Sequence, residues 1–216
     1  MIIKKKPLRK YNDILQIGAG GIGFWLAYRL LLDFNTDFNK LIVVDFDKVE
    51  WHNLNRLPYI PKEIEEGGDV GRLKIEAMER FFNFWFKDIV DVKNKLITIN
   101  AYIDKEKLKD ILDEYENIDI VINCSDMKGN ITPISIDRKV EYCRIGCDGK
   151  NWFWFRIPIN ENAPYEPEPE KENIYVMSDV IGNYFASIKA VELLFYSKVS
   201  IDGGVVPRNI IFKKEL

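Results

Sequence analysis

The amino-acid sequence predicts an α/β fold, with a mostly parallel sheet covered by helices on both faces. Short apolar runs rich in valine and isoleucine alternate along the chain with longer segments of helical periodicity. Continuous apolar runs are typical of parallel strands, because helices cover both faces of such a sheet. A glycine-rich turn at residues 18–23 also follows the first apolar run directly, as expected of a strand–turn–helix unit.

The first half of the chain contains a regular series of strands and helices. Each expected strand is a short apolar run bounded by polar or turn-forming residues. The expected strands are 14–17, 41–45, 96–99 and 118–123. Between them, apolar residues recur at helical spacing, and the expected helices are 22–32, 72–86 and 105–115. The aromatic run at 81–86 is expected to pack in the core, with a dimer contact as the alternative.

The second half of the chain has a less regular pattern. The expected elements are a helix over 130–138, strands at 143–146 and 151–157, a helix over 178–194 and a terminal strand over 205–212. Segment 158–173 is rich in proline and glutamate, which predicts an extended polar loop. There is no internal repeat and no sign of a second domain, so we expect one domain over residues 1–216.

Composition and charge exclude several classes of protein. The 216 residues are 47% hydrophobic and 30% charged, which is typical of a globular domain. The formal net charge of −3 gives no general attraction to nucleic acid. No apolar stretch is long enough to span a membrane and the N-terminus lacks a signal-peptide pattern, so we expect a cytoplasmic protein. The three cysteines form neither a disulfide framework nor two C-x-x-C pairs, so we expect no structural zinc.

The glycine-rich turn predicts a phosphate-binding loop. Its glycines allow the backbone to turn tightly and approach a phosphate, and the helix that follows directs its free N–H groups at the anion. They are Gly18, Gly20, Gly21 and Gly23. Asp45 ends the second apolar run, where a carboxylate can accept hydrogen bonds from ribose hydroxyls. This order predicts a Rossmann-like nucleotide-binding site; a glycine turn without a ligand is the alternative.

Polar residues beyond Asp45 favour a nucleoside triphosphate as the ligand. Arg56 lies in the segment after the second strand, Lys74 opens a helix and Asp126 ends a buried strand. Hydride transfer needs no such set around the phosphates. Attack on a nucleoside triphosphate does, because charge must be neutralised as pyrophosphate leaves and an aspartate can hold magnesium.

Each of these residues also has an ordinary structural interpretation. Arg56 could form a surface ion pair, and Lys74 could be a solvated residue on an amphipathic helix. Asp126 could cap the helix that follows it, and Asp47 could form a turn. The single histidine, His52, lies in a polar loop, and we assign it no chemistry.

Four motifs, in this order along the chain, resemble those of the adenylation domain of the ThiF/MoeB/ubiquitin-activating family. They are a G-x-G-G-x-G loop at 18–23, a D-x-D-x-V-E…N-L-N-R segment at 45–56, a G-x-x-K at 71–74 and a hydrophobic strand ending in C-S-D at 124–126. The N-L-N-R element at 53–56 is the most specific. The resemblance extends to the helix after residue 178 and implies a single ThiF-type adenylation domain.

The resemblance implies roles for the residues around the phosphates. The four glycines would line the phosphate loop. Asn53, Arg56 and Lys74 would contact the triphosphate, and the two cations would stabilise charge in the transition state. Asp126 would hold the magnesium ion.

The resemblance also implies how the nucleoside half of ATP is bound. Asp45 would take the ribose. Asp47 lies close enough to the site to take part, with a less defined role. The adenine would lie near Ala101, after the third strand, where the family uses largely backbone contacts.

The chain departs from the family in three places. Segment 159–176 holds no cysteine where some members carry a nucleophile, so we expect no enzyme thioester there. The residues before position 14 are too few for the arginine-bearing helix that reaches the partner subunit's nucleotide in many members. Asn123 replaces the family's usual first aspartate, which leaves Asp126 as the one carboxylate for the metal.

Taken together, the motifs and the resemblance predict an ATP- and Mg²⁺-dependent adenylyltransferase. Its substrate would be the C-terminal carboxylate of a small ubiquitin-fold or sulfur-carrier protein, or of a peptide, activated as acyl-AMP. A carboxylate is already ionised at neutral pH, so the attack needs no general base. The resemblance implies a homodimer, and we expect no nucleic-acid or membrane partner.

Two other functions stay open from the sequence. The chain could be a catalytically weak nucleotide-binding subunit that pairs with an active relative, as in the family's heterodimers. It could instead be an NAD-dependent oxidoreductase, which would use the glycine loop but would leave Arg56, Lys74 and Asp126 without a role.

Overall fold

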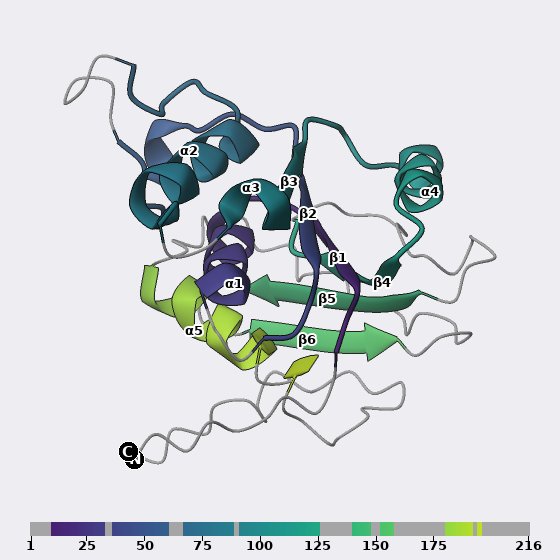
Figure 1. Cartoon of the computed structure of the whole chain (residues 1–216). Coiled ribbons are helices and arrows are strands. Elements are labelled where there is room, and N and C mark those ends of the chain that lie inside the picture. Colours follow the sequence, from purple (N-terminus) through teal and green to yellow (C-terminus); the bar gives the residue numbers. More distant parts are fainter. Residues whose placement is uncertain are drawn as a thin grey trace, which may run out of the picture.

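The computed structural model describes residues 10–32, 36–60, 67–88, 91–125, 140–147, 152–157, 180–191 and 194–195. Within them, helices pack on both faces of one sheet (Figure 1). The expected α/β, Rossmann-like architecture is confirmed.

The described sheet has six strands in the order β3-β2-β1-β4-β5-β6. They are β1 (Asp13–Ile17), β2 (Lys40–Val44), β3 (Leu96–Ile99), β4 (Ile118–Asn123), β5 (Glu141–Cys147) and β6 (Trp152–Ile157). Strands β1 to β5 are parallel, and β6 runs antiparallel to β5. The strand order reverses at β1, which has β2 on one side and β4 on the other. In open parallel sheets, ligands bind at the carboxyl ends of the strands at such a point.

The two faces of the sheet carry different helices. The described helices are α1 (Gly21–Leu32), α2 (Lys74–Phe86), α3 (Val92–Lys95), α4 (Lys105–Glu114) and α5 (Val180–Val191), with a short 3-10 helix η1 (Trp51–Asn53). Apolar residues of α1, α2, α3 and α5 form one buried cluster with the sheet. Helix α4 forms a second cluster on the opposite face, and Figure 1 shows it standing apart from α1, α2 and α5.

Helix α4 illustrates how the sequence forms these elements. Asp104 precedes it, and its Oδ1 accepts a hydrogen bond from the Lys107 N–H at 2.8 Å, which caps the first turn. Leu108, Ile111 and Leu112 recur at helical spacing and are fully buried against the sheet.

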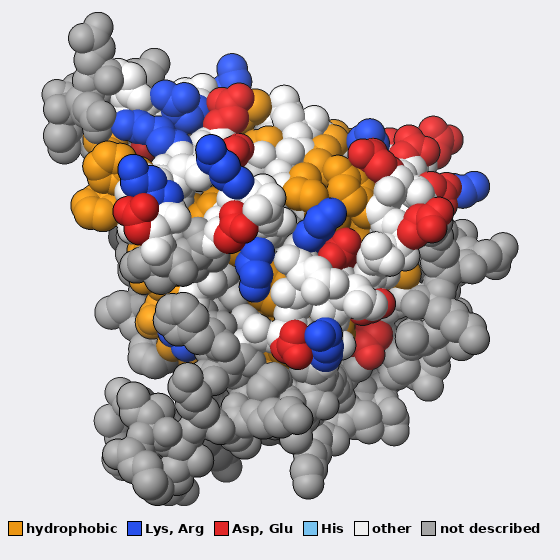
Figure 2. Space-filling model, in the orientation of Figure 1, with side chains coloured by type: hydrophobic (Ala, Val, Ile, Leu, Met, Phe, Trp, Pro, Cys, Tyr) orange, Lys and Arg blue, Asp and Glu red, His pale blue; other side chains and the backbone are white. Residues whose placement is uncertain are grey.

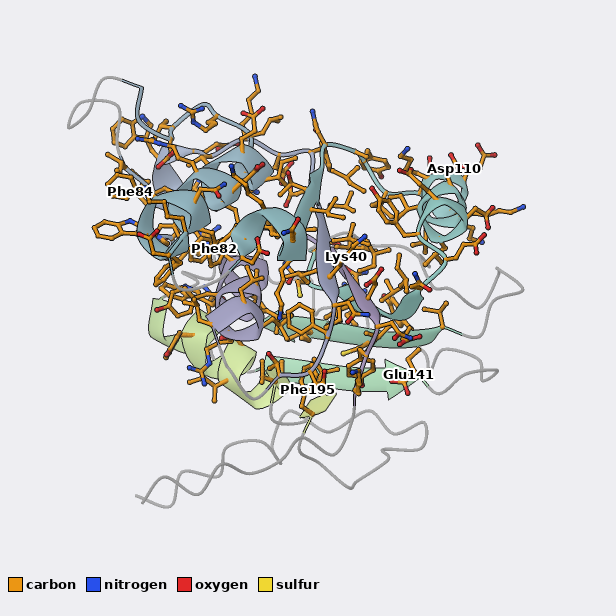
Figure 3. The ribbon with its side chains drawn as sticks, in the orientation of Figure 1. Lys40, Phe82, Phe84, Asp110, Glu141 and Phe195 are labelled. Carbon is orange, nitrogen blue, oxygen red and sulfur yellow. The ribbon has the colours of Figure 1, made fainter. Side chains whose placement is uncertain are left out.

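The aromatic run on α2 divides between the core and the surface. Phe82 is fully buried and stacks on Phe24 of α1, with ring centroids 5.9 Å apart. Phe84 and Trp85 are 71% and 61% exposed, and their rings meet edge to face. Figure 3 shows Phe82 directed toward α1 and Phe84 directed away from it. Core packing is therefore confirmed for Phe82 and is wrong for Phe84 and Trp85.

On the face drawn in Figure 2, acidic and basic side chains are interspersed.

Most observed boundaries lie close to the expected ones. The helix expected from residue 72 begins at Lys74, because residues 71–73 pair with residues 47–49. Helices η1 and α3 were not expected from the sequence. The expected elements at 130–138, 158–173 and 205–212 lie outside the described residues. Among the described helices, none combines the length and apolar character needed to cross a membrane.

Candidate functional site

A pocket of about 270 Å³ opens at the carboxyl ends of the parallel strands. Its walls come from the segments after β1, β2, β3 and β4 and from the start of α2. The lining residues are Ile17, Gly18, Gly20, Val44, Asp45, Phe46, Asp47, Lys74, Ala101, Ile103, Cys124 and Ser125. Six residues expected at the site therefore meet in one pocket, although they come from four segments of the sequence. These six are Gly18, Gly20, Asp45, Asp47, Lys74 and Ala101.

The glycine loop is packed on one side and faces the pocket on the other. Gly18 has a φ of +99°, and a Cβ there would lie 3.1 Å from the carbonyl carbon of Cys124. A Cβ on Gly23 would overlap the carbonyl oxygen of Gly18. Gly20 lines the pocket and has open space where a Cβ would stand. The loop therefore keeps its backbone accessible on the side that faces the pocket.

Asp45 ties the glycine loop to the segment after β2. Its Oδ2 accepts from the Ala19 N–H at 2.6 Å, and its Oδ1 accepts from the Asp47 N–H at 2.7 Å. Burial raises the pKa of this carboxyl, and the two backbone donors act in the opposite direction. Each carboxylate oxygen can accept more than one hydrogen bond, so this structural role is compatible with binding a ribose.

Lys74 is the cation that the structure places in the pocket wall. Its Nζ lies 2.8 Å from Oδ2 of Asp47, and its N–H donates to the Asp47 carbonyl at 2.8 Å. Lys48 and Leu73 form an antiparallel bridge beside this contact. The segment before α2 is thus attached to the segment after β2, and the helix begins with its lysine at the pocket.

Asp69, which the sequence analysis missed, supports this attachment. It is buried, and its Oδ2 accepts from the Ile60 N–H at 2.8 Å. Its Oδ1 accepts from Arg80 Nη1 of α2 at 3.0 Å, and Arg72 Nε lies 3.7 Å away. The Asp69 carboxylate therefore connects Ile60, which precedes segment 61–66, with Arg80 of α2. The available signal in the sequence was an aspartate followed by Gly71, Arg72 and Arg80.

Asn53 is used within its own turn. Its Oδ1 accepts from the Glu50 N–H at 2.9 Å, which caps the 3-10 helix η1, and the residue is buried. Its side chain is outside the lining of the pocket. The contact that the structure shows is therefore structural, and the triphosphate contact expected for Asn53 stays a proposal.

Arg56 lies against the first turn of α1, beside the pocket. A Cβ on Gly21 would stand 3.0 Å from Arg56 Cδ, so the arginine stem covers this end of the helix. The Arg56 carbonyl accepts from Trp25 Nε1 at 2.9 Å, and its Nη1 donates to the His52 carbonyl at 3.1 Å. The backbone is thus anchored to α1, with the guanidinium bonded to the neighbouring turn.

Two buried amides that the sequence analysis missed also contact the glycine loop. Gln16 of β1 donates from Nε2 to the carbonyls of Gly18 and Gly23, each at 2.9 Å. Asn183 of α5 is buried against Gly21, where a Cβ would stand 2.5 Å from its Nδ2. A glutamine inside an apolar strand run was the signal for the first residue, whereas Asn183 gave no distinctive signal.

Phe46 of the pocket lining forms an aromatic pair with Tyr102. Ala101 lines the pocket after β3, where the adenine was expected. Phe46 and Tyr102 stand beside it with ring centroids 5.1 Å apart, edge to face, and they are 44% and 55% exposed. Phe46 and Ala101 therefore add apolar surface to a lining that also carries charged residues.

The turn after β4 is held by Asn123. Its Nδ2 donates to the Tyr142 hydroxyl at 3.0 Å, and its Oδ1 accepts from the Ser125 N–H at 3.0 Å and Oγ at 2.7 Å. Ser125 lines the pocket next to this turn. Asp126, the expected magnesium ligand, lies outside the described residues.

The described thiols near the pocket are protonated at neutral pH. Cys124 lines the pocket but is buried, and burial raises the pKa of its thiol far above the ordinary value. Burial also raises the pKa of the neighbouring Cys143. Since the thiolate is the nucleophilic form, both side chains are poor nucleophiles here.

A glycine loop at a helix start, a carboxylate at the end of the second strand and a strand order that reverses at β1 define a Rossmann-like α/β protein. Comparison with known families agrees with that class. The model of the ThiF family matches residues 4–139, and the chain belongs to this family.

Curated relatives carry the name ubiquitin-like modifier-activating enzyme 5. The Drosophila mojavensis protein is 29% identical over 166 residues, and the match covers 75% of this chain and 37% of that enzyme. The Caenorhabditis elegans protein is 27% identical over 167 residues, covering 75% of this chain and 35% of that enzyme. The chain thus spans little more than a third of the length of these relatives.

Solved structures share the fold at low sequence identity. Escherichia coli MccB, crystallised with AMPCPP and MccA, superposes with a TM-score of 0.61 at 18% identity, covering 85% of this chain and 54% of that chain. PaaA superposes with a TM-score of 0.61 at 16% identity, covering 85% of this chain and 54% of that chain. The topology of the described sheet is therefore a known arrangement.

Proposed function

We propose that the protein is an adenylyltransferase that uses ATP and Mg²⁺ to activate a C-terminal carboxylate as acyl-AMP. The observation that carries this proposal is Lys74, whose ammonium lines the same pocket as the glycine loop. Membership of the ThiF family supports it. So do the names of the relatives, which are ubiquitin-like modifier-activating enzymes, and the crystallisation of MccB with ATP.

The proposed reaction is an attack of the carboxylate on the α-phosphorus of ATP, with pyrophosphate leaving. The nucleophile is already ionised at neutral pH, so no side chain has to remove a proton. The protein would accelerate the step by positioning the reactants and by neutralising the charge that develops on the phosphates. Lys74 and Arg56 would supply positive charge, and the N–H groups at the start of α1 would bind phosphate oxygens.

The residues around the pocket are compatible with magnesium held mainly by the nucleotide. Among the described residues, no group of three or more His, Cys, Asp or Glu side chains gathers at one point. Mg²⁺ beside a nucleotide commonly binds one or two carboxylates together with phosphate oxygens and waters. Asp126 would be that carboxylate, and the ion would supply charge neutralisation on the leaving pyrophosphate.

The other end of ATP would lie toward β2 and β3. Asp45 would accept from the ribose with the lone pairs that its two backbone donors leave unused. The adenine would lie at Ala101, close to the exposed rings of Phe46 and Tyr102. Asn53 would contact the triphosphate through its Nδ2 donors, since the cap contact with the Glu50 N–H uses only its Oδ1.

The proposed substrate is a small ubiquitin-fold or sulfur-carrier protein, or a peptide with a free C-terminus. The protein would work in the cytoplasm as a homodimer, with no nucleic-acid or membrane partner. A catalytically weak nucleotide-binding subunit is the second candidate. The replacement of the family's usual aspartate by Asn123, whose amide is engaged with Tyr142 and Ser125, favours that candidate.

Exchange of labelled pyrophosphate into ATP tests the proposal. The acceptors are small carrier proteins ending in Gly-Gly and peptides with a free C-terminus, each matched by the same molecule with an amidated C-terminus. We expect exchange only with free carboxylates. Lys74→Ala and Arg56→Ala should each lower it about a hundred- to a thousandfold, the usual cost of one preorganised contact to developing charge.

Lys93→Ala is the matched control for this experiment. Lys93 is exposed on α3, which leads into the amino end of β3 and so lies at the opposite edge of the sheet. Its loss should leave exchange unchanged. ATP binding without exchange, for every acceptor, would favour the weak subunit. Exchange that survives both the Lys74 and Arg56 substitutions would show that the site is placed wrongly.

A further inference from the structure

Gln16 is a polar residue in an apolar strand. It lies on β1 and is fully buried, on the strand face that also carries Ile14 and packs toward α1. A buried amide is costly unless it forms hydrogen bonds. The hydrogen-bond partners of Gln16 should therefore explain why an amide occupies this position.

Both of its donor bonds go to the glycine loop. Nε2 donates to the Gly18 carbonyl at the end of β1 and to the Gly23 carbonyl in the first turn of α1, each at 2.9 Å. A side-chain amide has two N–H groups, so one group spans the two ends of the loop. The reverse orientation of the amide would set Oε1 against two carbonyl oxygens, so the orientation is fixed by chemistry. Oε1 is buried and has no partner within the described part of the chain.

Each of the two carbonyls belongs to a peptide unit that is also held at its N–H end. In a trans peptide the C=O and N–H groups point in opposite directions. The Gly18–Ala19 unit is bonded to Gln16 through its carbonyl and to Asp45 through its N–H, at 2.6 Å. In the Gly23–Phe24 unit, Phe24 N–H donates to the Gly20 carbonyl at 2.8 Å. Gln16 thus fixes the tilt of one peptide plane on each side of the loop.

We propose that Gln16 is a positioning residue for the phosphate loop, which it holds in the shape that presents the N–H groups at the start of α1 to a bound phosphate. The proposal rests on the proposed function, because it assigns a task to the loop in that site. Gly23 supports it, since a Cβ there would overlap the Gly18 carbonyl and would stand 3.0 Å from Gln16 Nε2. Only glycine at position 23 therefore lets the first turn of α1 lie against both the Gly18 carbonyl and the Gln16 amide.

The test compares Gln16→Met with Leu15→Met. Methionine is close to glutamine in length and removes both donors. The control changes the adjacent fully buried residue, which lies on the other face of the strand with the α4 cluster. Gln16→Glu is a second variant of the same shape, whose side chain has at most one donor, in its protonated form, and so cannot bond to both carbonyls at once.

The first readout is amide hydrogen exchange without any ligand. We expect the Ala19 and Phe24 amides to exchange about tenfold faster in Gln16→Met and Gln16→Glu, as for the loss of a local hydrogen bond, with no change in β2. Leu15→Met should leave the loop amides unchanged. Equal exchange at Ala19 in the wild type and in both Gln16 variants would overturn the proposal, as would a uniform increase over the whole sheet.

The second readout is pyrophosphate exchange with ATP. We expect KM for ATP to rise about tenfold in the Gln16 variants with a smaller change in kcat, because a misaligned loop weakens phosphate binding. A change in melting temperature with unchanged KM would show a merely structural role. A wild-type protein that neither binds ATP nor exchanges pyrophosphate would contradict the proposed function, while the hydrogen-exchange result would still decide whether Gln16 shapes the loop.

Discussion

Lys74 and Asp47 form an ion pair in the wall of the pocket, with Nζ 2.8 Å from Oδ2. The two residues are also joined through the main chain, since Lys74 N–H donates to the Asp47 carbonyl. The lysine is therefore held in place by contacts within the protein itself. A phosphate at the glycine loop would share this ammonium with Asp47 or displace the carboxylate, which is 48% exposed and can turn toward water.

Asp47→Ala should weaken ATP binding without abolishing the reaction. The variant keeps the ammonium in the site but removes the group that orients it, so we expect KM for ATP to rise about tenfold, the scale of one charged hydrogen bond. The half-exposed ion pair should change the free energy of unfolding by no more than about 1 kcal/mol. Pyrophosphate-exchange kinetics and urea denaturation measure the two effects. A loss of rate as large as that of Lys74→Ala would mean that Asp47 itself acts on the reacting groups.

Mg·ATP should stabilise the protein more than NAD does. The cation in the pocket wall is suited to a triphosphate, and at a concentration of about 100 dissociation constants a ligand adds roughly 2.7 kcal/mol to the free energy of unfolding. Thermal melting with each ligand at equal concentration measures the difference. Lys74→Ala should reduce the shift with Mg·ATP. A larger shift with NAD would support the oxidoreductase interpretation in place of adenylation.

The pKa of Asp45 predicts a pH dependence of stability. Burial raises it above the ordinary 3.8, so between that value and the raised pKa the folded state binds more protons than the unfolded state. The free energy of unfolding should therefore fall as pH rises through this window. Asp45→Asn lacks the titration, so the stability of the wild type relative to the variant should decline over the same window. Urea denaturation of both proteins in steps from pH 3.5 upward measures this, and a difference that grows with pH would contradict it.

Serine substitutions of the cysteines should leave acyl-adenylate formation largely unchanged. The raised pKa values of Cys124 and Cys143 keep both thiols protonated, and segment 159–176 contains no cysteine. Cys124→Ser, Cys143→Ser and Cys147→Ser are each compared with the wild type in pyrophosphate exchange, after a melting curve has corrected for folding. A carrier–enzyme thioester that is cleaved by a reducing agent and lost in one of these variants would overturn this expectation.

Local patterns in the sequence predicted the strands, most helices and the loop that carries Gly18. Asp45 and Lys74 were expected at one site for a different reason, namely the charge that a triphosphate requires and the resemblance of their motifs to those of the family. What local patterns could not predict are contacts that depend on tertiary register. Asp47 and Lys74 are 27 residues apart, and nothing near either residue specifies their pairing.

Two residues show why the rest of the site was not predictable. Asn53 belongs to the most specific motif, yet its oxygen is used by the main chain three residues earlier, which only the local turn geometry reveals. Asp69 bonds to Ile60, on the other side of segment 61–66, and to Arg80 within α2. Its role therefore depends on where α2 packs. In both cases the residue type was visible in the sequence, but its partner was not.

Three main-chain hydrogen bonds continue the ladder of the sheet past the ends of its strands. Gly18 N–H donates to the Val44 carbonyl at 2.8 Å, Asp45 N–H to the Ile99 carbonyl at 3.2 Å and Cys124 N–H to the Ile17 carbonyl at 2.8 Å. All three donors line the pocket. These bonds tie the floor of the pocket to the central strands, so we expect it to open together with the core and not by itself. Any change of shape on binding a ligand is then expected from the surrounding segments.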